Sequence, residues 1–416
     1  MKHPAIPLRW RRTLRRIRRP IRFGNLRRTS PISDHWGRDR GTPIDRWYIE
    51  RFLAVHAADI SGRVLEVRDP GYVQRFGHDL ARIDILDVDA ANVRATIVAD
   101  LATPESLPDS AFEDGLWTAS GGWPAILHLA PTQLLTDGNR TPATAISTSS
   151  AELSELNGIA FATDGTMWVT SQHDSTLVAF APTSLAHSGS ADATVRISSP
   201  ALGGPTGLAF DKQHRLWVAN LDHGTVVRFD PTQLASSGSP IPAVIIAGLG
   251  QPAALAFDAA GSLWVSDIRR NKIASFSEAQ ISASGFLAPQ VVISALAASL
   301  QNPAGIAFDA DGNLWVANTS NQTVVAFSPS QLAATGSPAP HVVLSTNASL
   351  GNPAGLAFDA DGALWVVGDA DAVEKFPKAS LGATGAPAPS VRLTLANYTL
   401  FWNVAFWPKP SGLPLN

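Results

Sequence analysis

Side chains that could bind a metal ion or a ligand recur at two fixed places after residue 113. One place lies three residues ahead of a repeated GLAF-like motif and holds Glu155, Gly204, Gln251, Asn302, Asn352 and Leu400. The other lies three residues after a repeated tryptophan and holds Ser120, Ser171, Asn220, Asp267, Asn318 and Gly368. Carboxylate and amide oxygens are ligands for hard divalent cations, so Glu155, Asn220, Asp267 and Asn318 predict a divalent cation site if the fold brings them together. Short polar side chains also cap strand ends by hydrogen-bonding to nearby backbone, and this second interpretation fits the same positions.

Groups that could move a proton are few in the same part of the chain. Its glutamates are Glu152, Glu155, Glu278 and Glu374. His173 in SQHDST and His223 in LDHGT follow two successive tryptophan motifs. A histidine close to Glu155 could abstract a proton in a lyase-type reaction. The alternative is that both histidines are solvated loop residues.

The tryptophan motif belongs to a longer repeat, which indicates how these side chains are positioned. Trp117, Trp168, Trp217, Trp264, Trp315 and Trp365 recur at intervals of 47 to 51 residues. Each unit has four short runs of β-branched and aromatic residues, separated by turn residues such as Asp311 and Gly312. This pattern is typical of a four-stranded antiparallel sheet. Six such units predict a mainly β fold, a six-bladed β-propeller, with an open solenoid as the alternative.

The two ends of the repeat favour the closed ring. The first unit has the tryptophan strand but no GLAF-like strand ahead of it, whereas WNVAFWP at residues 402–408 carries the missing element. We therefore expect a C-terminal strand to lie innermost in the first blade, which would remove the open sheet edges that favour aggregation. The repeated tryptophans are expected to pack between blades.

The repeat NPAGIAFDADGNLWVANTSNQTVVAF and its copies resemble the NHL-repeat propellers, together with virginiamycin B lyase-like and gluconolactonase-like proteins, over about residues 114–416. The resemblance implies the fold, and its members include lactonases, lyases and binding modules. The site of one Glu with Asn and Asp in gluconolactonase-like proteins implies a similar role for the proposed cation ligands. The wider face implied for ligand binding comprises Glu155, Asn220, Asp267, Asn318, Gln251, Asn302, Asn352, His173 and His223.

Residues 34–113 have a different pattern, a helix followed by short strands. Ile44, Tyr48, Phe52 and Val55 share one side of the predicted helix, and GRVLEV, RIDILDV and ATIVADL are strand-like. With RGTPIDRWYIERFL ahead of them, these runs resemble the start of a class I S-adenosylmethionine-dependent methyltransferase, an incomplete Rossmann-like α/β segment. The resemblance implies cofactor contacts at Glu66, Asp69, Gly71, Asp87 and Asp100. Two departures weaken it, because Arg68 stands where glycine is expected and only three strands are present, so S-adenosylmethionine binding would require completion by a dimer.

Composition bounds the remaining possibilities. Residues 1–33 hold Lys2 and ten Arg with no acidic residue, which predicts a disordered basic arm or contact with an anionic surface. The chain has no cysteine, and no apolar run is long enough for a membrane span. We expect a cytoplasmic protein with a basic arm (1–33), a methyltransferase-like segment (34–113) and a propeller (114–416). Its expected function is binding of a protein, peptide or glycan ligand, with a metal-dependent lactonase or lyase and a methyltransferase as alternatives.

Overall fold

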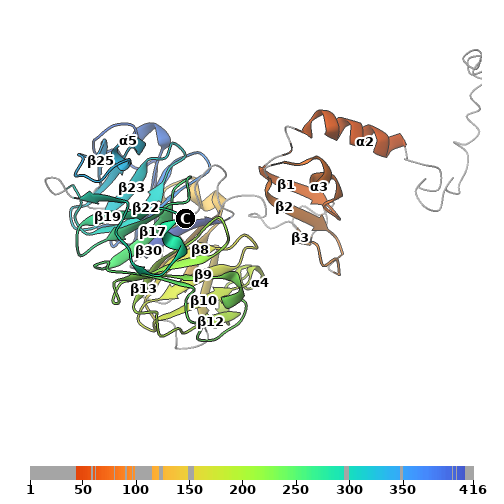
Figure 1. The fold of residues 1–416 in the computed structure, drawn as a ribbon. Helices are drawn as coiled ribbons and strands as arrows, with labels where there is room; N and C mark the ends of the chain where they lie inside the picture. Colours follow the sequence, from red (N-terminus) through yellow and green to blue (C-terminus); the bar gives the residue numbers. More distant parts are fainter. Residues whose placement is uncertain are drawn as a thin grey trace, which may run out of the picture. The chain divides into compact units, whose positions relative to one another are not determined.

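The computed structural model describes residues 44–57, 60, 62–78, 80–89, 91–95, 97–98, 115–120, 125–148, 154–294, 299–346, 350–395, 397–399 and 401–407. The chain forms two compact units, Met1–Leu107 and Pro108–Asn416 (Figure 1). The predicted basic arm and Asp100 lie outside the described residues, as does the predicted boundary after residue 113. In the part of the chain that is described, no helix is long and apolar enough to cross a membrane.

The first unit contains a small parallel sheet. Its elements are α2 (Ile44–Val55), β1 (Gly62–Val67), α3 (Gly71–Phe76), β2 (Leu80–Asp87) and β3 (Ile97–Val98), with strand order β1-β2-β3. The predicted helix is present, but Tyr48, Phe52 and Val55 are largely exposed. Val73, Ile85 and Leu86 are the buried apolar side chains among the described residues of this unit. The parallel pairing is that of an α/β unit, and the finer identification as Rossmann-like stays a prediction.

The second unit is a ring of six antiparallel sheets, here called blades 1 to 6 in the order of their tryptophans (Figure 1). From the centre outward, blade 1 contains β30 (Phe401–Trp407), β4 (Gly115–Ser120), β5 (Ala125–Leu129) and β7 (Thr144–Thr148), and blade 2 contains β8 (Leu156–Phe161), β9 (Met167–Ser171), β10 (Thr176–Phe180) and β12 (Val195–Ile197). Blade 3 contains β13 (Pro205–Phe210), β14 (Leu216–Asn220), β15 (Thr225–Phe229) and β16 (Val244–Ala247), and blade 4 contains β17 (Pro252–Phe257), β18 (Leu263–Asp267), β19 (Lys272–Phe276) and β21 (Val291–Ser294). Blade 5 contains β22 (Pro303–Phe308), β23 (Leu314–Asn318), β24 (Thr323–Phe327) and β25 (Val342–Ser345), and blade 6 contains β26 (Pro353–Phe358), β27 (Leu364–Gly368), β28 (Ala372–Phe376) and β29 (Val391–Leu395).

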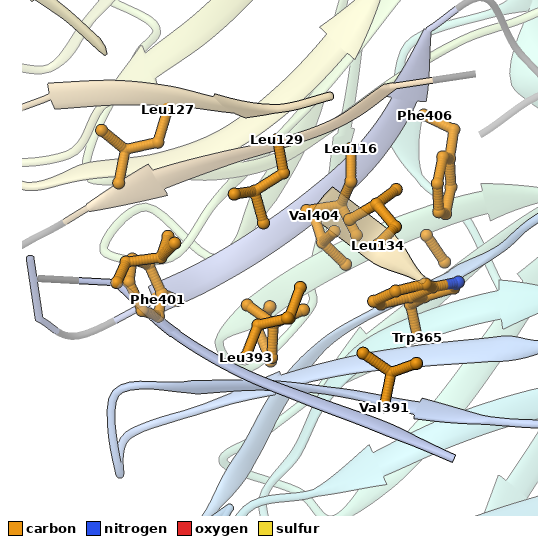
Figure 2. Packing of buried hydrophobic residues seen from close by; sticks show 14 of the residues in the cluster. Leu116, Leu127, Leu129, Leu134, Trp365, Val391, Leu393, Phe401, Val404 and Phe406 are labelled. Atoms are coloured by element: carbon orange, nitrogen blue, oxygen red, sulfur yellow. The ribbon is translucent and has the colours of Figure 1, made fainter. Parts of the chain in front are cut away.

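The C-terminal strand closes the ring as the sequence predicts. β30 pairs antiparallel with β4, with Ala405 opposite Trp117 and Phe406 opposite Leu116. The cluster that joins blade 6 to blade 1 includes Trp365, Phe406, Val404 and Leu116, and Figure 2 shows these side chains together. Closure therefore joins the last strand of the chain to the first blade through both backbone pairing and apolar packing.

The repeated tryptophans fill the space between blades, also as predicted. Each is at most 5% exposed. In blades 3 to 6 the indole meets the phenylalanine of the next inner strand edge to face, with ring centroids 6.0–6.1 Å apart: Trp217–Phe257, Trp264–Phe308, Trp315–Phe358 and Trp365–Phe406. In the same blades an aspartate accepts a hydrogen bond from the indole Nε1, as Asp309 does from Trp315 at 2.8 Å.

A turn of helix follows each third strand. These turns are η4 (Pro131–Leu134), α4 (Pro182–Leu185), η5 (Pro231–Gln233), η6 (Gln280–Ser282), α5 (Pro329–Leu332) and η7 (Lys378–Ser380). Four of them use a glutamine to bridge the loop. Gln331, for example, accepts from Ser328 N and donates to the Ala339 carbonyl. The glutamine of motifs such as FDPTQL, residues 229–234, thus holds the chain as it leaves the third strand.

The next stretch of each blade pairs with the outer strand of the preceding blade. The pairs are parallel and use β6 (Gly138–Arg140), β11 (Gly189–Ala191) and β20 (Gly285–Phe286), or bridges at Gly238, Gly336 and Gly385. The residue before each glycine also accepts a backbone N–H from the same outer strand, through Asp137, Ser188, Ser237, Ser284, Thr335 or Thr384. We call these six segments the outer belt. They cover the sheet edges that would otherwise be open to other strands.

Candidate functional site

A cavity of about 400 Å³ lies where the inner strands begin and where the turns between second and third strands meet. All six blades contribute to its wall. Blades 1 and 2 contribute its aromatic, charged and paired amide side chains, which are Trp402, Asn403, Glu155, Asn157 and Gln172. Blades 3 to 6 contribute apolar side chains and short polar ones, among them Leu221, Ile268, Thr206, Asn302 and Thr319. The cavity is therefore amphipathic.

A repeated backbone hydrogen bond fixes the rim of this cavity. In each of five blades, the residue after the second strand donates its N–H to the carbonyl of the residue three places ahead of the inner-strand glycine position. The bonds are Gln172 to Glu155, Leu221 to Gly204, Ile268 to Gln251, Thr319 to Asn302 and Asp369 to Asn352, at 3.0–3.2 Å. The donors of blades 2 to 5 thereby become part of the cavity wall.

Glycines of the inner strands narrow the ring below the cavity. A Cβ placed on Gly207 would lie 2.5 Å from the Ala253 carbonyl oxygen, and Gly158 and Gly305 approach the next inner strand at least as closely. These glycines are needed for close backbone approach. A smaller space of about 90 Å³ continues along the inner strands, lined by Ile159, Leu208, Leu255, Ile306, Leu356 and Val404. The floor of the cavity is thus apolar.

The structure does not bring the four predicted cation ligands together. Only Glu155 lines the cavity. Asn220 is fully buried, donates to Ala201 O and Thr225 Oγ1, and accepts from Gly203 N at 3.4 Å. Asn318 repeats this arrangement, with Ser299 O, Thr323 Oγ1 and Gln301 N as partners. These contacts are the ones expected if both amides cap loops.

Asp267 has the same role in blade 4. Its two carboxylate oxygens accept the backbone N–H groups of Gly250 and Gln251, at 2.7 and 3.0 Å. Because the oxygens of Asp267, Asn220 and Asn318 are used within their own blades, they do not converge on one point. Among the described residues, no three His, Asp or Glu side chains lie close enough together to hold a metal ion.

The other predicted face residues divide into three groups. Asn302 lines the cavity. Gln251 and Asn352 are half-buried beside it, and Asn352 Nδ2 donates to Asp369 Oδ2 at 2.7 Å. His173 and His223 are exposed on the turns of blades 2 and 3 and do not line the cavity, so the predicted histidine and Glu155 pair is not found there.

Blade 2 has no aspartate or asparagine at the end of its second strand, and Asp174 takes over the capping role. Its Oδ2 accepts from Ser154 N and from Ser171 Oγ, at 2.8 and 2.6 Å. Partial burial works to raise the pKa of Asp174, but the hydrogen bonds from Ser171 and Ser154 outweigh it and lower the pKa. This carboxylate is therefore structural.

Several cavity residues were not identified from sequence. Trp402 is 40% exposed, and Asn157 Nδ2 donates to Gln172 Oε1 at 3.1 Å. The sequence feature that could have identified them is the type of residue just before the inner-strand glycine position. It is alanine in blades 4, 5 and 6 but asparagine in blade 2, threonine in blade 3 and tryptophan in blade 1. All six of these residues line the cavity, and the departures from alanine supply its polar and aromatic side chains at this position.

The predicted cofactor residues of the first unit hold their own turn. Glu66 accepts the N–H groups of Tyr72 and Val73 at 2.9 Å each, and Asp69 accepts that of Gly71. Asp87 accepts from Asn92 Nδ2 at 2.8 Å, and this hydrogen bond is the main cause of its lowered pKa.

Arg68 has φ of 75°, the left-handed conformation that favours glycine. The residue expected from the resemblance to be glycine therefore does occupy a glycine-like backbone conformation. Asp100, the fifth predicted contact, lies outside the described residues.

Comparison with known proteins gives one family match. The NHL repeat matches residues 300–327, which span β22, β23 and β24 of blade 5. No curated protein matches. Similar solved structures include a streptogramin B lyase (12% identity, 65% of this chain and 78% of that chain, TM-score 0.46). Others are a catalytically inactive virginiamycin B lyase from Staphylococcus aureus with quinupristin (12%, 65% and 83%, 0.44) and a nidogen/laminin complex (16%, 70% and 98%, 0.49). No comparison supports the methyltransferase resemblance.

Proposed function

We propose that this propeller is a binding module whose ligand enters the cavity at the mouth of the ring. The observation that carries the proposal is the make-up of the wall, where an exposed indole and apolar side chains face amide and hydroxyl groups. Ligand sites in proteins are typically concave and mostly apolar, with a few polar groups that fix orientation. A small molecule, or the end of a protein, peptide or glycan chain, would fit such a space.

Binding is favoured over catalysis by the ionisable groups of the wall. Glu155 is the one ionisable side chain among the residues that line the cavity. General acid–base chemistry needs a second group that gives or receives the proton, or a bound water held for it. The metal-dependent lactonase or lyase alternative would need the oxygens of Asn220, Asp267 and Asn318, which cap loops instead.

The test is a ligand screen by thermal shift on the full chain and on two variants. Trp402→Ala removes the exposed indole from the cavity wall. Phe286→Ala is the matched control, because Phe286 is 87% exposed in the outer belt and does not line the cavity. Compounds that stabilise the natural chain and the Phe286 variant, but not the Trp402 variant, would support the proposal. Compounds that stabilise the Trp402 variant as much as the natural chain, or a screen without any stabilising compound, would contradict it.

A further inference from the structure

Glu155 has a backbone conformation that does not suit glutamate. Its φ is 53°, in the left-handed region. The matching residues with the same conformation are Gly204 in blade 3 (φ 56°) and Asn302 in blade 5 (φ 54°), which are types that tolerate it. The fold does not require glutamate at this position, because glycine and asparagine occupy it in blades 3 and 5. A glutamate held in a strained conformation there suggests a role for its side chain. The side chain in question is the carboxylate at the cavity rim.

The surroundings of this carboxylate suit a positive charge. Among the described residues, none donates a hydrogen bond to this carboxylate and none forms an ion pair with it. No Lys, Arg or His is among the residues that line the cavity. β30, which carries Trp402, is the inner strand next to β8, which begins one residue after Glu155. The indole and the carboxylate thus belong to the same side of the cavity. Cations bind over indole rings by attraction to the ring quadrupole and pair with carboxylates.

The part of the wall that Leu221, Ala253 and Ile268 of blades 3 and 4 form suits hydrocarbon. Leu221, Ile268 and Ala253 present no side-chain donor or acceptor to the cavity. A sugar would stack on Trp402 but would place hydroxyl groups against these apolar side chains. A metal ion would need several converging oxygens, and among the lining residues only Glu155 offers a carboxylate.

We propose that the cavity binds an organic cation, an alkylammonium group held between Glu155 and Trp402 with its hydrocarbon part against Leu221 and Ile268. The inference rests on the proposed binding function and names its ligand class. The probe is choline, compared with its neutral isostere 3,3-dimethyl-1-butanol, by isothermal titration calorimetry on the full chain. We expect choline to bind at least tenfold more tightly than the alcohol.

Three variants sharpen the test. Glu155→Gln is expected to weaken choline binding at least tenfold and to leave binding of the alcohol unchanged. Asp222→Asn is the matched control, because Asp222 is an exposed acid on the turn of blade 3 that does not line the cavity, and it should leave choline binding unchanged. Glu155→Gly should abolish the preference for choline while raising Tm by about 1–3 °C, because glycine relieves the strain.

The possible failures are distinguishable. Equal affinity for choline and the alcohol, or tighter binding of N-acetylglucosamine or Ca²⁺ that depends on Glu155, would overturn the cation proposal and leave the binding function standing. The binding function itself fails only if the ligand screen yields no compound that depends on Trp402. A Glu155→Gly variant that melts below the natural chain would show that the glutamate is kept for stability, which also overturns the inference.

Discussion

Blades 3 to 6 and blades 1 and 2 pack the same tryptophan with different chemistry. In blades 3 to 6, Asp211, Asp258, Asp309 and Asp359 each accept the indole N–H at 2.7–3.0 Å. Blade 2 has Ala162 at this position and blade 1 has Trp407. Trp407 stacks on Phe161, with ring centroids 5.0 Å apart, and Trp117 stacks on His128 at 4.4 Å. Blade 1, which contains the closing strand, therefore has aromatic contacts where blades 3 to 6 have a carboxylate, and blade 2 has an alanine there.

The same two blades supply the distinctive side chains of the cavity. Trp402, Glu155, Asn157 and Gln172 all belong to blades 1 and 2, whereas the other blades have alanine, threonine, leucine or isoleucine at most of the matching positions. The more similar blades complete the ring, and under the proposed binding function the blades that depart from the repeat are the ones expected to distinguish its ligand. The following predictions test whether this division is real.

The largest expected effect is loss of a tryptophan from a regular blade. Trp315 is 2% exposed and packs against Phe358 of blade 6. Trp315→Ala should lower the free energy of unfolding by about 3–5 kcal/mol, as for other buried aromatic residues. Urea unfolding measures the change, with Phe286→Ala as a surface control. A loss below about 1 kcal/mol would mean that the indole does not carry the packing between blades.

The next largest effect is a loss of stability at acid pH that arises from a histidine of blade 1. Burial lowers the pKa of His128 to about 4, whereas in the unfolded chain it titrates near its ordinary value. As pH falls from about 6.5 toward 4, the unfolded chain takes up a proton that the folded chain does not, so stability falls. The loss should approach about 3 kcal/mol. Blades 3 and 6 have Arg228 and Lys375 at the matching place, over Trp217 and Trp365.

Urea unfolding between pH 7 and pH 4.5 measures this loss. His128→Phe keeps an aromatic ring beside Trp117 and should flatten the pH dependence relative to the natural chain. His187→Asn, which changes an exposed histidine, should leave it unaltered. If the His128 and His187 variants follow the same pH curve, the acid sensitivity arises elsewhere.

A third prediction concerns the aspartate that blades 1 and 2 lack. Asp309 accepts from Trp315 Nε1 and from the backbone N–H groups of Asp311 and Asn313. Asp309→Ala leaves these donors without their partner and should cost about 2 kcal/mol. A double-mutant cycle with Trp315→Phe isolates the carboxylate and indole pair, for which we expect a coupling of about 1 kcal/mol. Zero coupling would mean that the aspartate stabilises only the turn at Asp311 and Asn313, and not the indole.

The sequence was sufficient for the ring and less so for the cavity, for a physical reason. The period of the tryptophan and glycine motifs specifies the strands, and the split first blade specifies closure by residues 402–408. The cavity depends on a finer feature. Each inner strand has an irregular register against its neighbour, as between Pro205 and Leu208 or between Pro303 and Ile306.

Such a bulge redirects side chains in a way that simple alternation along a strand does not predict. The residue before each inner-strand glycine position therefore reaches the cavity wall, as Asn157 and Trp402 do. The polar residues that end the second strands turn away from it, as Asn220 and Asn318 do. Glu155 and Asn302, two of the face residues predicted from the sequence, line the cavity because their loops lie at the mouth of the ring whatever the register.

The smallest expected effect lies in the outer belt, where blade 1 again differs. Asp137 Oδ1 accepts from Arg392 N at 2.8 Å, where blade 5 uses the Thr335 hydroxyl to accept from Val292 N at 3.0 Å. Hydrogen bonds to an ionised acceptor are roughly twice as strong as neutral ones. Asp137→Ala should therefore cost about 1 kcal/mol and Thr335→Val about half as much. Hydrogen exchange at the Arg392 and Val292 amides is the sensitive measurement, because each change opens one outer strand locally. Faster exchange confined to the strand that loses its acceptor would support the role of the outer belt. Equal losses of stability in the two variants would mean that the charged acceptor of blade 1 is no stronger than the hydroxyl of blade 5.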